Sequence, residues 1–317
     1  MFRNIILALL CITLISAEKS IVFERFLEFT HKYNKTYNSM EEFQQKFEVF
    51  KANLLEIAAA DDFSGLHTKR ITKFSDLTKE EFRKQFLTLK VESPGWCQQG
   101  KKFLHEEVSS VTDFDWRTQG GVSPVKDQGQ CGSCWAFSTV AFLESQSLIK
   151  NKKAVTYSEQ QLVDCDHNGD EGCNGGLMHT ALQYIQGAGI ESDTKYPYAA
   201  RTEWFCWYNK SDVIATVSDI NCYENISNAQ LQNYVTSVGP ISIAVDASDF
   251  QSYDSGILDC PYSQLNHGVL LVGFTANTWI IKNSWGKNWG ESGFVRVQNT
   301  KGHNCGVGEY AVTATLK

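Results

Sequence analysis

The chain has 317 residues, 42% of them hydrophobic, so it can bury the core of one large domain or of two smaller ones. Its formal net charge is −7, and the acidic excess falls after residue 110, where 13 Lys and Arg stand against 21 Asp and Glu. An acidic surface of this kind argues against nucleic acids and anionic membranes as partners.

The first 17 residues have the features of an export signal. Arg3 precedes an apolar run (residues 5–15), and two small residues follow it. The run is too short to span a bilayer, and no later stretch has about 18 consecutive apolar residues, so we expect a signal peptide at 1–17 and no membrane anchor. Three sequons fit the same secretory route as expected glycosylation sites: Asn34, Asn209 and Asn225.

Residues 18–109 differ from the rest of the chain, because their 15 basic and 15 acidic residues balance. Apolar side chains at helical spacing predict a helix over residues 41–60: Phe43, Phe47, Phe50, Leu54 and Ile57. The stretch 91–110 is polar and contains Pro94-Gly95, which indicates a linker. We therefore expect a helical N-terminal region followed by a separate C-terminal domain.

In the C-terminal region, helix patterns come first and strand patterns follow. Residues 134–150 and 176–186 are amphipathic, with Gly187 expected to end the second helix. Ser158 and Gln161 have the spacing of a capping box, which predicts another helix start. β-branched runs predict strands at 241–245, 269–272 and 294–297. This order is typical of an α+β fold, here with two lobes and a cleft between them.

The stretch QGQCGSCWAFS (residues 128–138) holds Cys131 and Cys134. Unpaired N–H groups at a helix start favour a thiolate, so Cys134, where the helical pattern begins, is the candidate nucleophile. A redox Cys-x-x-Cys pair would follow a strand, whereas segment 122–126 is short and contains proline. Zinc would need a second Cys or His pair at ligand spacing, and the sequence has none, so we expect no metal.

A cysteine nucleophile needs a base, and four histidines follow residue 110. His267 opens the apolar run of a predicted buried strand, where an imidazole can face a cleft. His167 in a polar loop and His179 on a helix face are expected at the surface, and His303 lies in a loop beside Cys305. His267 is therefore the candidate base.

Four motifs, in this order, resemble those of the papain-like cysteine peptidases: QGQCGSCWAFS, GCNGG (172–176), NHGVLLVGF (266–274) and KNSWG (282–286). His267 and Asn283 follow Cys134 by 133 and 149 residues (267 − 134 and 283 − 134), and the family places its His and Asn about 130–150 residues downstream. The pattern is nearest to the cathepsin L-like group. The resemblance implies a helical lobe and a β-barrel-like lobe with a cleft between them, preceded by a helical prosegment.

The resemblance also implies roles for individual residues. Cys134 would be the nucleophile, His267 its base, and Asn283 the acceptor that orients the imidazole. Gln128 and the backbone N–H of Cys134 would stabilise the oxyanion, and Trp285 would shield the His–Asn hydrogen bond from water. No cofactor is implied. The implied substrate-binding residues are Gly175, Gly176, Leu177, Met178, Ala244, Leu265, Trp285 and Tyr310.

The resemblance further suggests three disulfides: Cys131–Cys173, Cys165–Cys206 and Cys260–Cys305. Cys97 and Cys222 have no counterparts in the family. Three alternatives stay open for them: they pair with each other, remain free, or link two chains.

Upstream of the linker, six positions resemble the family's prosegment helix motif: Glu42, Lys46, Phe50, Asn53, Ile57 and Asp61. Phe74-Ser75-Asp76 resembles the end of a second motif, in which Arg70 and Thr72 replace the usual Gly and Asn. We therefore expect an inhibitory propeptide at 18–109 and a peptidase domain at 110–317. Protonation of Asp76 and other prosegment carboxylates should weaken docking at acidic pH.

Together these features predict a cysteine endopeptidase made as a zymogen, a monomer in the lysosome or a similar acidic vesicle, or secreted. Its expected partners are protein and peptide substrates, its own propeptide and cystatin-like inhibitors. In the specificity pocket, Tyr310 should favour Val or Leu over Phe, unless it points outward and leaves a deep pocket. The alternative function is an inactive binding or inhibitory relative, which would usually lack Cys134, His267 or Gln128; all three are present.

Overall fold

The computed structural model describes residues 21–61, 66–91 and 111–317, and the expected signal peptide, most of the linker and Cys97 lie outside these residues. Residues 21–32 are helical, and the N-terminal region continues with α2 (Met40–Asp61), β1 (His67–Lys69) and α3 (Lys79–Phe86). The C-terminal region then contains β2 (Phe114–Asp115), α4 (Cys134–Asn151), α5 (Glu159–Cys165), η1 (Gly172–Asn174), α6 (Met178–Ala188), β3 (Ile190–Glu191), η2 (Lys210–Asp212), β4 (Val213–Ala215), β5 (Val217–Glu224), α7 (Asn228–Ser237), β6 (Ile241–Val245), β7 (Tyr253–Leu258), β8 (His267–Phe274), β9 (Thr278–Lys282), β10 (Phe294–Gln298) and β11 (Tyr310–Leu316).

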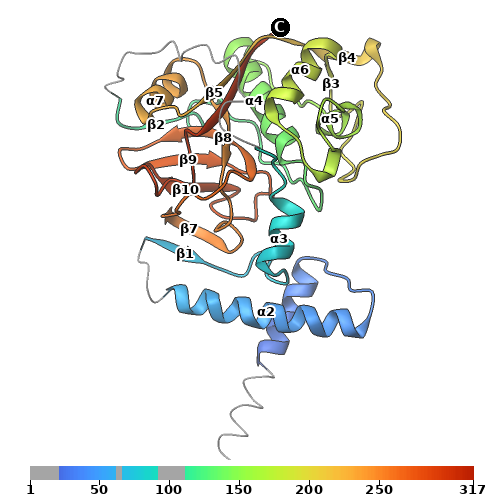
Figure 1. The fold of residues 1–317 in the computed structure, drawn as a ribbon, viewed down its shortest axis with the longest axis vertical. Helices are drawn as coiled ribbons and strands as arrows, with labels where there is room; N and C mark the ends of the chain where they lie inside the picture. The colour runs from blue at the N-terminus through green and yellow to red at the C-terminus, as the bar shows by residue number, and fades with distance from the viewer. Residues whose placement is uncertain (1–20, 62–65, 92–110) are drawn as a thin grey trace, which may run out of the picture.

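A nine-stranded sheet forms the β half of the molecule (Figure 1). Its strand order is β1-β7-β10-β9-β8-β6-β11-β5, with β2 paired to β8. The strand pairs are antiparallel except for β7 with β10, which is parallel. The three predicted strands are β6, the central part of β8, and β10. The α+β class is therefore confirmed.

The central strand β8 is buried along its whole length. Successive side chains of a strand point to opposite faces, and on β8 they enter two different hydrophobic clusters. Val269 and Leu271 join the cluster that includes α7, whereas Leu270 and Val272 join the cluster that includes α4. Because both faces are covered, the strand reads as a continuous apolar run rather than as an alternating one.

Helix α4 is the central element of the helical half, where it contacts β8, α5 and α6. The three disulfides that the resemblance implied are all present: Cys131–Cys173, Cys165–Cys206 and Cys260–Cys305. Cys222 on β5 is also disulfide-bonded, which excludes a free thiol there. Among the described residues Cys134 is the free cysteine.

The helix at residues 21–32 crosses α2 in the N-terminal region (Figure 1). The rings of Phe26 and Phe29 pack against Phe50 of α2, with centroids 5.3 and 5.0 Å from that of Phe50. Asn53 of α2 donates hydrogen bonds to the carbonyl oxygens of Ser75 and Leu77, both at 2.9 Å. These contacts fix α2 to the turn that leads into α3. None of the helices in the described ranges is long and apolar enough to cross a membrane.

Two local predictions differ from the structure. Ser158 caps α5 by accepting from Gln161 N, but the Gln161 side chain does not return the bond, because its Oε1 accepts from Glu191 N at 2.8 Å. Helix α6 passes through Gly187 and ends at Gly189, whose φ of +81° is strained for other residues. A residue distant in sequence decides the first case, and a positive φ angle at Gly189 decides where the helix ends in the second.

Candidate active site

Cys134 is the first residue of α4, and its side chain is fully buried. The thiol lies within hydrogen-bonding reach of the Gly268 backbone and of the hydroxyl of Thr88, a residue of the N-terminal region. Burial raises the pKa of the thiol, and these smaller contacts only partly offset it. Cys134 is therefore a neutral thiol while the N-terminal region covers it.

His267 and Asn283 meet because β8 and β9 pair: His267 opens β8 and Asn283 directly follows β9. His267 Nε2 donates to Asn283 Oδ1 over 2.8 Å, and this oxygen also accepts from Ser284 N at 2.8 Å. Burial lowers the pKa of His267 to about 4, against smaller opposing effects of Asn283 and the Phe86 backbone. The imidazole is therefore neutral in this covered state.

The start of β8 lies directly against the start of α4. A Cβ built on Gly268 would stand only 3.1 Å from the carbonyl oxygen of Cys134, so the missing side chain permits this close approach. The structure thereby brings together the ends of two elements that carry Cys134 and His267, as the motifs predicted.

Gln128 and Trp285 lie buried beside His267 and Asn283. The Trp285 ring packs on the His267 imidazole with centroids 4.7 Å apart, and its Nε1 donates to Gln128 Oε1 at 3.1 Å. Gln128 Nε2 donates to the carbonyl oxygen of Cys131 at 2.9 Å. These bonds orient the Gln128 amide and leave its second N–H for another acceptor.

The expected pocket residues come from α6, β6, β11 and the loop that precedes β8. Met178, Ala244, Leu265 and Tyr310 belong to one hydrophobic cluster with Cys134, and Leu177 packs against it. Tyr310 is 1% exposed, which excludes the outward-pointing alternative. Its hydroxyl lies 3.1 Å from Nδ1 of His179. His179 was expected at the surface but is half-buried. Nothing in the sequence of its helix indicates the contact with Tyr310.

The segment after α3 lies across this site. Thr88 Oγ1 donates to the Gly132 carbonyl at 2.8 Å, and Leu89 N donates to the Asn266 carbonyl at 3.1 Å. A Cβ on Gly175 would stand 2.1 Å from the Thr88 carbonyl oxygen, so this position must lack a side chain. Leu89 is buried in the cluster that contains Tyr310. Sequence reasoning missed Thr88 and Leu89, which belong to no recognisable motif.

Comparison with known proteins identifies the chain. The sequence model of the papain family cysteine protease matches residues 110–315. The chain belongs to this family. The model of the cathepsin propeptide inhibitor domain matches residues 26–82. This papain-family protein is therefore a peptide-bond hydrolase with its own inhibitory propeptide, and the segment that covers Cys134 follows the matched propeptide region.

Similar proteins agree along nearly the whole chain. Cysteine proteinase 1 of Dictyostelium discoideum is 40% identical over 319 aligned residues, which cover 92% of each chain. Cysteine proteinase 15A of Pisum sativum is 42% identical over 89% of this chain and 83% of the relative. Among solved structures, digestive procathepsin L 3 of the Tenebrio molitor larval midgut has a TM-score of 0.83 at 35% identity, covering 93% of this chain and 99% of that one.

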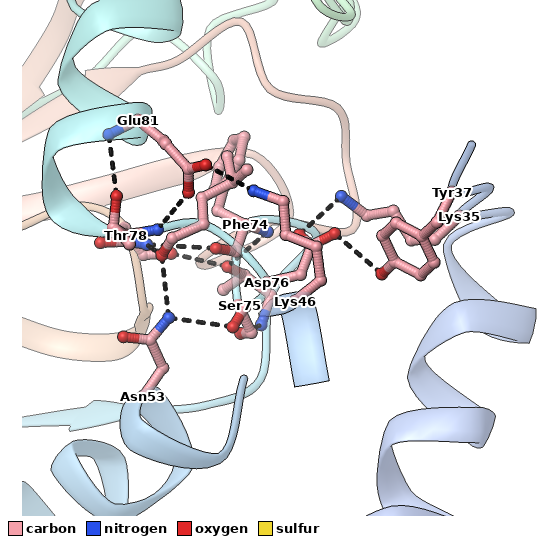
Figure 2. Close-up of polar contacts among 12 residues, drawn as sticks. Lys35, Tyr37, Lys46, Asn53, Phe74, Ser75, Asp76, Thr78 and Glu81 are labelled. Atoms are coloured by element: carbon pink, nitrogen blue, oxygen red, sulfur yellow. Dashed lines mark hydrogen bonds and ion pairs between the residues drawn. The ribbon is translucent and has the colours of Figure 1, made fainter. Parts of the chain in front are cut away.

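The prosegment of this papain-family protease docks through aromatic residues. Phe74 and Phe82 pack edge-on against Trp285, with centroids 5.0 and 5.4 Å apart, and both are 1% exposed. Figure 2 shows the polar contacts behind them: Asp76 accepts from Lys35 at 2.8 Å and from Tyr37 at 3.1 Å. The prosegment thus stabilises its own docking turn and packs against Trp285.

Arg70 and Thr72, the two departures from the family motif, both touch the peptidase domain. Arg70 pairs with Asp254 at 2.9 Å and donates to the Asn288 carbonyl at 2.7 Å. Thr72 Oγ1 donates to the Gln251 carbonyl at 2.6 Å. Both replacements therefore make side-chain contacts across the interface.

Proposed function

We propose that Cys134, His267, Asn283 and Gln128 carry out the peptidase reaction of this protein. The observation that carries the proposal is the 2.8 Å bond from His267 Nε2 to Asn283 Oδ1, placed on a strand whose start contacts the start of α4 at Cys134. This bond leaves Nδ1 of the imidazole as the atom that exchanges a proton with the thiol.

The steps follow from these positions. Once the prosegment leaves, the Cys134 thiol transfers its proton to His267, and the thiolate attacks the carbonyl carbon of a peptide bond. The oxyanion takes hydrogen bonds from the Cys134 backbone N–H and from the N–H of Gln128 that is not used by Cys131. His267 gives its proton to the leaving amine as the C–N bond breaks. Water then attacks the thioester, loses a proton to His267, and releases the acid and the thiol.

The test is the change Cys134→Ser in the full chain, followed by acid treatment and assay with a fluorogenic peptide. We expect activity to fall by at least about a thousandfold, because serine has no comparable anion at this site. The thermal unfolding midpoint and binding of a peptide-like inhibitor should be retained. The matched control removes the neighbouring disulfide with Cys131→Ser and Cys173→Ser, which should lower stability rather than chemistry. The assignment would be overturned if the folded disulfide variant lost turnover while Cys134→Ser stayed active.

We also propose the boundaries and the setting of the zymogen: signal peptide 1–17, propeptide 18–109 and peptidase domain 110–317. An acidic vesicle such as the lysosome, or the secreted medium, fits the export signal and the sequons at Asn34, Asn209 and Asn225. The protein would act as a monomer, and cystatin-like inhibitors would bind the same cleft that the prosegment covers.

Substrate choice is proposed to depend on Tyr310. Its buried ring, held by the hydroxyl contact to His179 Nδ1, shortens the pocket and favours Val or Leu over Phe two residues before the cut bond. Leu89 of the prosegment, in the same cluster, has the size that such a pocket accepts.

The change Tyr310→Ala should raise cleavage of a Phe substrate relative to its Leu counterpart by about tenfold, since removing the ring deepens an apolar pocket. Arg substrates should stay poor, because no carboxylate is added. The control is Tyr223→Ala, because Tyr223 lies on β5 and packs against the other hydrophobic cluster. A wild type that prefers Phe, with a ratio unchanged by Tyr310→Ala, would contradict the pocket assignment.

A further inference from the structure

Two carboxyl groups are buried together between α5 and α6. Asp166, the residue that caps the C-terminus of α5, is 0% exposed, and Asp170 in the following loop is 4% exposed. The Oδ2 atom of each is buried and receives no hydrogen bond from any other donor among the described residues. The two carboxyl groups are instead within hydrogen-bonding reach of each other. Two carboxylates cannot both stay charged in such a place, so a proton is required between them.

Asp170 also holds the segment proposed to bind substrate. Its Oδ1 accepts from Leu177 N at 2.8 Å and from Thr180 Oγ1 at 2.9 Å, so it fixes the entry into α6. A Cβ on Gly176 would stand 2.6 Å from this same oxygen, which places the carboxyl directly against the glycine. The backbone from Gly175 to Leu177 therefore rests on Asp170.

We infer that Asp166 and Asp170 share one proton, and that this proton holds the substrate-binding segment 175–177 in place. Asp170 is thus a positioning residue, acting through Leu177 and Gly176 and touching no reacting atom. The inference rests on the proposed assignment of Gly175, Gly176 and Leu177 to substrate binding. When the shared proton is lost, the two carboxylates repel each other and the segment loosens, so substrate should bind more weakly.

The surroundings favour retention of the proton through neutral pH. Burial first, and the charge of Asp166 second, raise the pKa of Asp170 to about 8. Burial also raises the pKa of Asp166, but the Asn168 N–H and the contact with Asp170 favour its ionised form, which makes Asp170 the proton donor of the pair. The facing groups on other elements are uncharged tyrosines, Tyr184 on α6 and Tyr310 on β11, and Tyr310 contacts His179. Glu171 points instead to Lys90 of the prosegment.

The test measures KM and kcat separately for a peptide substrate of the acid-activated full chain, from about pH 5 to about pH 9. In the wild type, KM should rise about tenfold as the rising pH removes the proton that Asp166 and Asp170 share. This rise in KM should exceed any change in kcat over the same pH range. Asp170→Asn should abolish this rise, because its amide donates to Asp166 permanently while its oxygen still accepts from Leu177. Asp170→Ala should raise KM by about tenfold at every pH, since both hydrogen bonds are lost.

The control is Asp164→Asn. Asp164 is a buried carboxylate on α5 that accepts from Tyr196 and Glu203, away from segment 175–177, so its KM profile should follow the wild type. Infrared difference spectra should also show the stretch of a protonated carboxyl at neutral pH in wild type, lost in Asp170→Asn. An equal alkaline rise of KM in wild type and Asp170→Asn overturns the inference. So does an unchanged KM in Asp170→Ala. Neither result bears on the Cys134 assignment, whose failure would appear as activity retained in Cys134→Ser.

Discussion

At the scale of single residues, the covered site keeps its two reactive groups uncharged. Burial acts in opposite directions on them, raising the pKa of the Cys134 thiol and lowering that of the His267 imidazole to about 4. The thiolate–imidazolium pair that the proposed reaction needs is therefore disfavoured while Thr88 and Phe86 lie over the site. Inhibition in this protein includes suppression of the nucleophile as well as physical blockage of the cleft.

This state predicts the reactivity of Cys134 toward iodoacetamide. Between about pH 5 and pH 8, the pH lies above the His267 pKa of about 4 in the full-length zymogen. The imidazole is therefore neutral and has no positive charge to stabilise a thiolate. Alkylation, followed by mass spectrometry, should therefore be at least about a hundredfold slower in the zymogen than in the activated enzyme. Cys134→Ser, which should take up no label at this site, is the control. Equal labelling rates before and after activation would show that the pair is already ionised under the prosegment.

At the scale of elements, the local apolar pattern predicts a helix or strand correctly when residues within that element decide where it begins and ends. Helix α4 and strands β6 and β10 fall where their apolar patterns lie, because each buries those side chains. Gln161 fails as the second half of a capping box because Glu191, thirty residues later, competes for its side chain. Gly187 fails as a helix stop because α6 tolerates a glycine at a cost of about 1 kcal/mol, and the chain reverses only at Gly189.

Helix α3 makes an element-scale prediction, since it presses Phe82 against Trp285. The change Phe82→Ala removes a buried ring at the interface, a loss of about 3–5 kcal/mol for a well-packed site. Activity of the intact chain at neutral pH should rise by at least about tenfold, measured before any cleavage of the prosegment is visible on a gel.

The matched control for α3 is Phe23→Ala. Phe23 is 41% exposed and contacts Phe43 and Phe47 within the prosegment, so its loss should leave the docking face intact. If both variants release activity equally, general loosening of the prosegment explains the effect and the Trp285 contact has no special role.

At the scale of the whole molecule, the ordered motifs predicted which residues of the C-terminal domain meet. Cys134, His267 and Asn283 are far apart in sequence, yet fixed spacing and strand pairing bring their elements together. The path of the prosegment could not be predicted in this way. Thr88 and Leu89 are placed by contacts with Gly132 and Asn266, which depend on the folded surface and leave no pattern in the sequence.

The whole-molecule charge pattern shows on which side of the interface the paired carboxylates lie. Asp76, whose protonation the sequence predicts to weaken docking, pairs with Lys35 and Tyr37 inside the prosegment (Figure 2). Among the described residues, three ion pairs cross the interface with the basic partner on the prosegment: Arg70–Asp254, Lys73–Asp127 and Lys90–Glu171. The acidic peptidase domain thus supplies the carboxylates of the ion pairs that cross the interface.

Asp254→Asn should therefore raise the pH of activation. Asp254 lies on β7, away from Cys134, and its pair with Arg70 is partly exposed, so its contribution is limited to about 0.2–1 kcal/mol. Removing that charge weakens docking at every pH, so the pH of half-maximal activation should rise by up to about half a unit. The pH is read from activity after timed incubation of the full chain in buffers of equal ionic strength, because salt screens such pairs. Glu56→Gln breaks the Lys79–Glu56 pair, which lies wholly within the prosegment, and should leave the midpoint unchanged. A shift with Glu56→Gln and none with Asp254→Asn would place the acid sensor inside the prosegment, as the sequence first suggested.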